Sequence, residues 1–136
     1  MTDCCEVIIT APDAHWLAAF TRALVDDRLA ACGHNITPIR SIYRWQGQVH
    51  DDTEARVALH TRAELVPAIV DRTNRDHPYD VPCVIATPIA AGNPAYLQWI
   101  RSETRSSGDA SPSLGLGGAQ TSLARVISDT RGRRSP

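Results

Sequence analysis

The sequence predicts an α+β domain in which a strand–helix–strand unit occurs twice and a β-hairpin joins the two units. Short β-branched or alternating segments, typical of strands, are separated by two stretches with apolar residues at helical spacing. The chain has 136 residues, 43% of them apolar, which suits one globular domain. No apolar run is long enough to cross a bilayer, and the net charge of −1 gives no reason to expect a nucleic-acid partner.

The first strand–helix pair is predicted before residue 34. Residues 4–10 are short, apolar and β-branched, as in a buried strand. Asp13 can cap the helix that follows, because its carboxylate accepts a hydrogen bond from the first turn. Gly33 is predicted to end this helix. The apolar face of the helix consists of Leu17, Phe20, Leu24 and Ala31.

A long β-hairpin is predicted next. Residues 36–45 are rich in Ile, Thr, Tyr and Trp, and residues 54–60 alternate between apolar and polar side chains. Residues 46–48, Gln-Gly-Gln, supply the turn. A protruding hairpin exposes strand edges that natural proteins cover or pair, so we expect an oligomer with β contacts between subunits. The segment carries more large apolar side chains than one helix-covered face requires: Ile36, Ile39, Ile42, Tyr43 and Trp45.

The second unit follows the hairpin. Thr61–Glu64 has the capping-box pattern of a helix start, but Pro67 then falls just beyond the first turn, so the helix either begins later or bends. Residues 83–89 form another apolar strand, and Asn93 with Pro94 begins a short terminal helix. The order βαββαβ plus a terminal helix is the ferredoxin-like arrangement, with a four-stranded antiparallel sheet and both main helices on one face.

Composition divides the chain into two parts. Residues 1–105 carry a net charge of −3 and hold all the predicted elements, so we assign them to one domain. Residues 106–136 carry a net charge of +2 and begin with a Gly/Ser-rich stretch, so we expect a disordered tail. A basic arm for nucleic acid is the alternative for this tail, although its four arginines are spread thinly.

Several kinds of chemistry are excluded or disfavoured. All 14 basic residues are arginines, so there is no Schiff-base lysine and no P-loop lysine. The four cysteines form no C-x-x-C pair, and the first residues do not resemble an export signal, so we expect reduced thiols in a cytoplasmic protein. No nucleophile elbow, H-E-x-x-H or paired-carboxylate motif occurs, so we expect no enzyme. A Cys-dependent or His-dependent hydrolase stays open as an alternative, because a Cys–His pair can form in space.

The chain resembles the CutA family, the divalent-cation tolerance proteins. The resemblance is carried in the family's order by Thr10-Ala-Pro-Asp13, Leu29-Ala-Ala-Cys32, Ser41-Ile-Tyr-Arg-Trp-Gln-Gly47, His77-Pro-Tyr-Asp-Val-Pro82 and Gly92-Asn-Pro-Ala-Tyr-Leu-Gln-Trp-Ile100. These stretches span residues 5 to 105. The tail has no counterpart in the family pattern.

The resemblance implies a compact cytoplasmic homotrimer whose ferredoxin-like protomers join at their sheet edges. It implies a role in tolerance of, or response to, metal ions, with copper or another divalent metal as the bound ion and without catalytic activity. The alternative is a PII-like signalling trimer that binds a small effector or an unknown partner protein between its subunits. No nucleic-acid or membrane partner is implied.

The resemblance also places a metal-ligand set at Ile9, Asp76 and His77. Ile9 cannot bind a metal, so the family's thiolate is missing at that position. Cys83 stands where the family usually carries Glu, and it either restores a soft ligand or packs. The candidate set is therefore His77, Asp76 and Cys83. The alternative role for His77 is to end the preceding helix, where an imidazole suits the helix dipole.

A second pair with ligand chemistry lies earlier in the chain. Cys32 and His34 share one face if their segment is extended, and a thiolate with an imidazole suits Cu or Zn. The alternative is that Cys32 is simply buried where the helix meets the strand. His15, His50 and His60 are expected to be solvated surface residues.

The family motifs also carry several aromatic and charged side chains that could line a cleft between subunits. Arg44 is the residue expected to hold an anionic ligand there. Packing within the trimer is the alternative role of the aromatic residues. The candidate cleft residues are Tyr43, Arg44, Trp45, Glu54, Tyr79 and Trp99.

Overall fold

The computed structural model describes residues 2–106 and confirms the predicted α+β fold and the predicted order of elements. All strand pairs are antiparallel, and the order across the sheet is β2-β3-β1-β4. The strands are β1 (Cys4–Ala11), β2 (Cys32–Trp45), β3 (Gln48–Arg62) and β4 (Val84–Pro88), and the helices are α1 (Ala14–Asp26), α2 (Val66–Asp76) and α3 (Pro94–Glu103).

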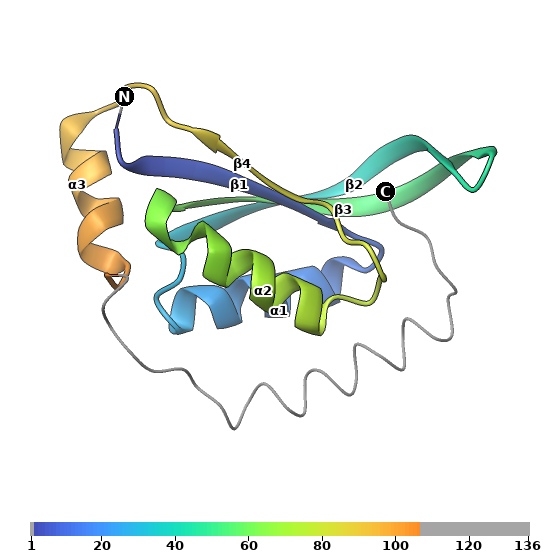
Figure 1. Cartoon of the computed structure of the whole chain (residues 1–136), viewed down its shortest axis with the longest axis horizontal. Helices are drawn as coiled ribbons and strands as arrows, with labels where there is room; N and C mark the ends of the chain where they lie inside the picture. Colours follow the sequence, from blue (N-terminus) through green and yellow to red (C-terminus); the bar gives the residue numbers. More distant parts are fainter. Residues whose placement is uncertain (1, 107–136) are drawn as a thin grey trace.

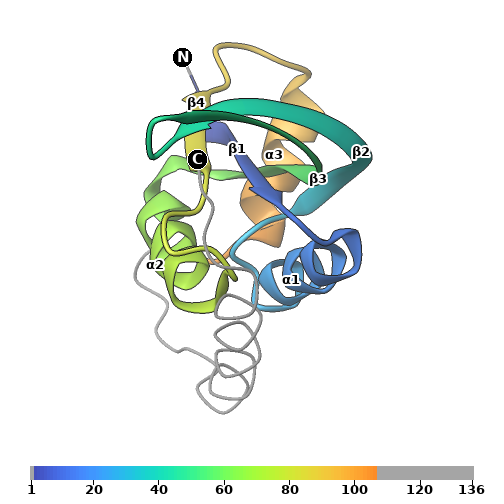
Figure 2. The same cartoon turned by 90° about the vertical axis from the view of Figure 1, so that its right-hand side faces the viewer.

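The two longer helices cover one face of the sheet, as Figures 1 and 2 show. The core lies between this face and the helices, where α1 contributes Leu17, Phe20 and Leu24 and the central strands contribute Val7, Ile9, Val57 and Leu59. Because side chains alternate along a strand, the residues between these apolar positions point to the opposite face. Helix α3 lies at the end of the sheet away from the hairpin tip (Figure 1).

The start of α1 was predicted correctly and its end was not. Asp13 accepts hydrogen bonds from the backbone N–H groups of His15 and Trp16, at 2.8 and 3.2 Å. The helix ends at Asp26, and the left-handed residue that follows is Arg28, with φ 60°. Gly33 therefore does not end the helix. It lies in β2, next to α1.

The second helix begins later than the capping-box pattern indicates. Thr61 still belongs to β3, and its hydroxyl donates to the carbonyl of Leu29 at 2.6 Å instead of capping a helix. A short 3-10 helix, Ala63–Leu65, leads into α2, whose first turn holds Pro67. A proline there lacks only an N–H that has no partner within the helix, so the alternative of a later start is confirmed.

The hairpin is longer than the sequence indicates. Its strands hold 14 and 15 residues, and the turn has left-handed backbone at Gln46 and Gly47, with φ 51° and 80°. The register of the β2–β3 ladder shifts between Ile36 and Ile39, next to a cis Thr37–Pro38 peptide bond. Large apolar side chains are exposed on the hairpin and on the other outer strand, namely Ile36, Ile42, Val49 and Ile85.

The terminal helix begins where the sequence predicts. Asn93 caps α3 by accepting a hydrogen bond from Ala95 N at 3.0 Å, and Pro94 is the first helical residue. Within residues 2–106, no helix has the length and apolar content needed to cross a membrane. The predicted tail, from residue 107 on, lies outside the described residues.

Candidate metal centre

A row of polar side chains crosses the face of the sheet that α1 and α2 leave uncovered. His60 on β3 is the register partner of Glu6 on β1 and of Cys32 on β2. His34 follows Cys32 by two residues and points to the same face. Four residues with ligand or acid–base chemistry are thus brought together from three strands.

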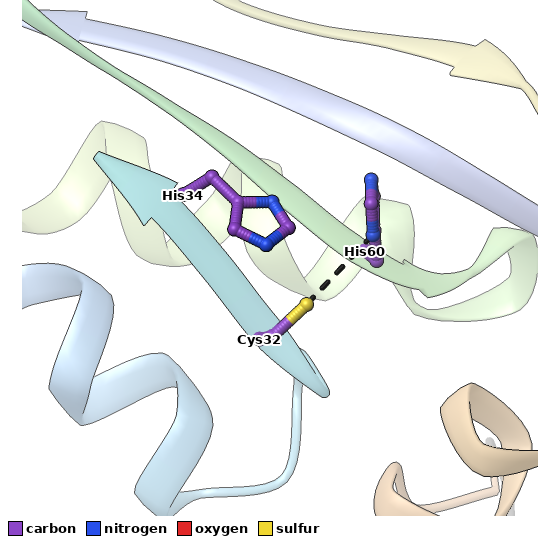
Figure 3. Close-up of side chains that lie close together, drawn as sticks. All are labelled: Cys32, His34 and His60. Atoms are coloured by element: carbon purple, nitrogen blue, oxygen red, sulfur yellow. Dashed lines mark hydrogen bonds between the residues drawn. The ribbon is translucent and has the colours of Figure 1, made fainter. Parts of the chain in front are cut away.

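Three of these residues form a group with metal-ligand geometry. One ligand atom of Cys32, one of His34 and one of His60 all lie within 4.8 Å of one another. In Figure 3 the Cys32 thiol and the His34 ring, both from β2, point toward His60 on β3. Cys32 Sγ lies 3.7 Å from His60 Nδ1, and the two imidazole rings meet edge to face with centroids 5.3 Å apart. This is the one such group of His, Cys, Asp and Glu among residues 2–106.

Two further side chains hold His60 in place. Its Nε2 lies 2.9 Å from a carboxylate oxygen of Glu6, and its Nδ1 lies 2.6 Å from the hydroxyl of Tyr96 on α3. The same hydroxyl lies 3.3 Å from Cys32 Sγ. Burial, the contact with Cys32 and the nearby charge of Glu6 raise the pKa of Tyr96 to about 12, so its hydroxyl keeps its proton at neutral pH.

The sequence had indicated only part of this group. The pair of Cys32 and His34 had been considered as a second candidate, beside the alternative that Cys32 is simply buried, but His60 was expected to be a solvated surface residue and is instead half-buried and hydrogen-bonded. His50 is half-buried too, and stacks on Tyr43, whereas His15 is exposed as expected. His60 was missed because the strand register is not regular. If the pairing next to the turn continued unchanged along both strands, Cys32 would lie opposite Thr61. The shift by one residue sets it opposite His60.

His77, from the ligand set that the family resemblance indicated, is buried and hydrogen-bonded to the backbone through both ring nitrogens. His77 is 4% exposed, and its ring donates to the carbonyl of Thr10 through Nε2 and accepts from Tyr79 N–H through Nδ1, at 2.8 and 3.0 Å. His77 also ends α2, as its alternative role predicted, but through its backbone N–H.

The other members of that set are placed as follows. Asp76 is 1% exposed and pairs with Arg72 and Arg75. Cys83 is half-buried just before β4. Asp76, His77 and Cys83 are not among the described groups of three ligands. Metal binding by this set stays a prediction.

The candidate cleft residues fall into three places within the chain. Tyr79 donates to the buried Glu54 carboxylate at 2.9 Å, so these two residues do meet. Tyr43, Arg44 and Trp45 lie on the hairpin, where Tyr43 donates to Asp52. Trp99 lies on α3 and stacks on Tyr96. Because the hairpin tip and α3 are at opposite ends of the described chain (Figure 1), a shared cleft needs more than one copy of the chain, and it stays a prediction.

Comparison with known proteins agrees with the fold. A family model described as CutA1 divalent ion tolerance protein matches residues 5–103. Protein CutA of Homo sapiens is 43% identical over 101 residues, which make up 74% of this chain and 56% of the human protein. The divalent-cation tolerance protein CutA of Thermus thermophilus is 42% identical over 98 residues, 72% of this chain and 95% of that protein.

A solved structure gives the same result in three dimensions. The divalent cation tolerance protein from Thermus thermophilus superposes with a TM-score of 0.73 at 40% identity, over 75% of this chain and 99% of that one. The match thus spans little more than half of the human relative but nearly all of the bacterial one. The resemblance noted in the sequence is confirmed: this chain belongs to the CutA1 family of divalent ion tolerance proteins.

Proposed function

We propose that this chain acts in divalent-cation tolerance by binding the cation itself, copper or another divalent transition metal, through Cys32, His34 and His60. The observation that carries the proposal is the convergence of one thiol and two imidazoles within 4.8 Å. Thiolate and imidazole together suit copper and zinc, whereas magnesium and calcium prefer oxygen ligands.

The spacing of the ligand atoms supports a tetrahedral ion. Bonds of about 2.3 Å to sulfur and 2.0–2.1 Å to nitrogen, at the tetrahedral angle, separate the two ligand atoms by about 3.6 Å. The separation of Cys32 Sγ and His60 Nδ1 is 3.7 Å. The pair therefore stands at the spacing of two ligands on one ion.

Calorimetric titration of the full chain with Zn²⁺ and Cu²⁺ tests the proposal. We expect one ion per chain, with binding weakened at least tenfold in Cys32→Ser and in His60→Ala. Cys83→Ser is the matched control, because Cys83 is a half-buried free thiol outside the group. If binding survives in Cys32→Ser and is lost in Cys83→Ser or His77→Ala, the ion binds at the site indicated by the family resemblance and the proposal is wrong.

We also propose that the working form is a homotrimer joined at its sheet edges. Both outer strands, β2 and β4, present exposed apolar side chains, among them Ile36 and Ile85. Unpaired edges of this kind are usually paired or covered. The subunit cleft with Arg44 belongs to this proposal. Light scattering should give a particle of three times the 14.8 kDa chain, and a single subunit at micromolar concentration would contradict it.

Other expectations from the sequence stay predictions. They are the cytoplasmic location, the lack of catalytic turnover and the absence of nucleic-acid and membrane partners. The PII-like alternative, with a small effector or a partner protein, gains no support from the comparisons. The metal proposal does not depend on any of them.

A further inference from the structure

The group is tied together by a directed chain of hydrogen bonds. A carboxylate only accepts, so His60 Nε2 carries the hydrogen toward Glu6. In the neutral ring Nδ1 is then an acceptor, and the Tyr96 hydroxyl donates to it. The Cys32 thiol is left to donate to the oxygen of Tyr96. The hydrogen bond to Glu6 thus leaves the lone pair of His60 on Nδ1, the ring nitrogen next to Tyr96 and Cys32. Carboxylates orient metal-binding histidines in this way.

The hydroxyl of Tyr96 stands where an ion would bind. It lies 2.6 Å from His60 Nδ1, whereas two ligand atoms on one tetrahedral ion, an oxygen and a nitrogen, are about 3.3 Å apart. Its position is therefore that of a hydrogen-bond partner rather than of a ligand. An ion cannot bond to Nδ1 while the hydroxyl occupies that lone pair.

We propose that the Tyr96 hydroxyl occupies the position of the ion whenever no ion is bound, so that the site binds an ion only when this side chain leaves. The inference rests on the proposed function, since it concerns the same three ligands. Glu6 is a positioning residue: its hydrogen bond with Nε2 holds the His60 ring so that Nδ1 faces the position that the Tyr96 hydroxyl leaves.

The surroundings of Tyr96 permit this movement. Tyr96 is 36% exposed at the start of α3, whereas Leu97 and Ile100 hold the helix itself against the domain. The ring can therefore turn outward without moving the helix. Tyr96 stacks on Trp99 with ring centroids 5.5 Å apart, so its departure changes the surroundings of an indole.

The number of protons released per bound ion shows whether the ion displaces the Tyr96 hydroxyl or is coordinated by it. When a divalent ion bonds to Cys32, the thiol loses its proton to the solvent. A displaced Tyr96 leaves as the phenol and keeps its proton. A coordinating Tyr96 would lose its proton as well, and the wild type would then release one proton per ion more than Tyr96→Phe.

Co²⁺ titration of the full chain, followed by the thiolate-to-cobalt charge-transfer band, measures the affinity. We expect Tyr96→Phe to bind about two- to tenfold more tightly, the equivalent of one hydrogen bond that no longer needs breaking, with proton release equal to that of the wild type. Ser102→Ala is the matched control, since it removes a hydroxyl from the same helix that donates to the carbonyl of Trp99 and not to the group. Zn²⁺ should change the emission of Trp99 in the wild type but not in Tyr96→Phe, with Trp99→Phe identifying the signal.

A second pair of variants tests the positioning role. We expect Glu6→Ala to weaken Co²⁺ binding about tenfold or more, and Glu6→Gln to recover most of it, because the amide oxygen still accepts from His60 Nε2. Glu64→Gln serves as the control at an exposed carboxylate.

The outcomes separate the two proposals. A charge-transfer band in the wild type with unchanged or weaker binding in Tyr96→Phe overturns the displacement of Tyr96 and leaves the metal site standing. If Tyr96→Phe releases one proton per ion fewer than the wild type, Tyr96 is a ligand, and the proposed displacement is likewise wrong. The absence of the band in both proteins removes the site, and the proposed function with it.

Discussion

Thr21 on α1 and Gly33 on β2 stand so close that a Cβ added to Gly33 would lie 2.5 Å from Cγ2 of Thr21. The added atom would also lie 3.1 Å from side-chain carbons of Leu59 and Val57 in the core. This close approach is what lets α1 pack on the edge strand. It also keeps Cys32 and His34, on either side of Gly33, pointing to the opposite face.

Gly33→Ala should therefore destabilise the domain by about 1–3 kcal/mol, the usual cost of overpacking. Thr21→Ser removes the clashing methyl, so the double variant should recover part of the loss. Gly92→Ala is the control, because a Cβ there meets only ordinary contacts at 3.6 Å and beyond. Urea denaturation gives the free energy of unfolding of the wild type, Gly33→Ala, the double variant and Gly92→Ala. Equal stability of Gly33→Ala and Gly92→Ala would contradict the close approach.

Thr61→Val tests the hydrogen bond that ties the end of β3 to the connection after α1. Thr61 is fully buried and donates to the carbonyl of Leu29 at 2.6 Å. Valine has the same shape but no donor, so we expect a loss of about 1–3 kcal/mol in the free energy of unfolding. The exposed Thr53→Val in the same strand should be close to neutral. A capping role for Thr61 predicts instead a specific loss of helix content, seen by circular dichroism.

The four cysteines should differ in their reactivity toward iodoacetamide at pH 7.5. Cys4 and Cys5 are buried, and burial raises the pKa of both thiols, that of Cys5 to about 11. Cys32 and Cys83 are half-buried and should be modified first. With Zn²⁺ present, Cys32 should be protected while Cys83 still reacts. Peptide mass mapping checks this, and equal protection of both would argue against the proposed ligands.

The ion pair between Asp3 and Arg101 predicts a small pH dependence of stability. Arg101 Nε donates to Asp3 at 2.8 Å, and this hydrogen bond lowers the pKa of the carboxyl below 3.8. Because the pKa of Asp3 is lower in the folded state, the ion pair contributes to stability above about pH 4. This contribution is lost as the pH falls through the pKa of Asp3 in the folded protein. Thermal melts from pH 7 to pH 3 should therefore show Asp3→Asn less stable near neutrality and equal to the wild type at the acid end. Because both side chains are partly exposed, the difference should be smaller than that of Thr61→Val.

The elements of the domain were predictable because their signals are local. Asp13 and Asn93 cap their helices with their own side chains, and the alternation in residues 54–60 is visible without any partner strand. The end of α1 was missed because Arg28, an ordinary residue, takes the left-handed conformation for which Gly33 was the expected choice. Tertiary contacts override such propensities.

Periodicity along the chain was enough to predict the α+β fold, and the quoted motifs were enough to indicate the family by resemblance. The two-residue spacing of Cys32 and His34 made them a candidate ligand pair, with burial of Cys32 as the alternative. That His60, Glu6 and Tyr96 join this pair follows from contacts between elements distant in the sequence. For His60 the reason is a one-residue shift of the hairpin ladder between Ile36 and Ile39. Side chains alternate along a strand, so this shift exchanges the buried Thr61 for His60 opposite Cys32, and nothing local in the sequence records it.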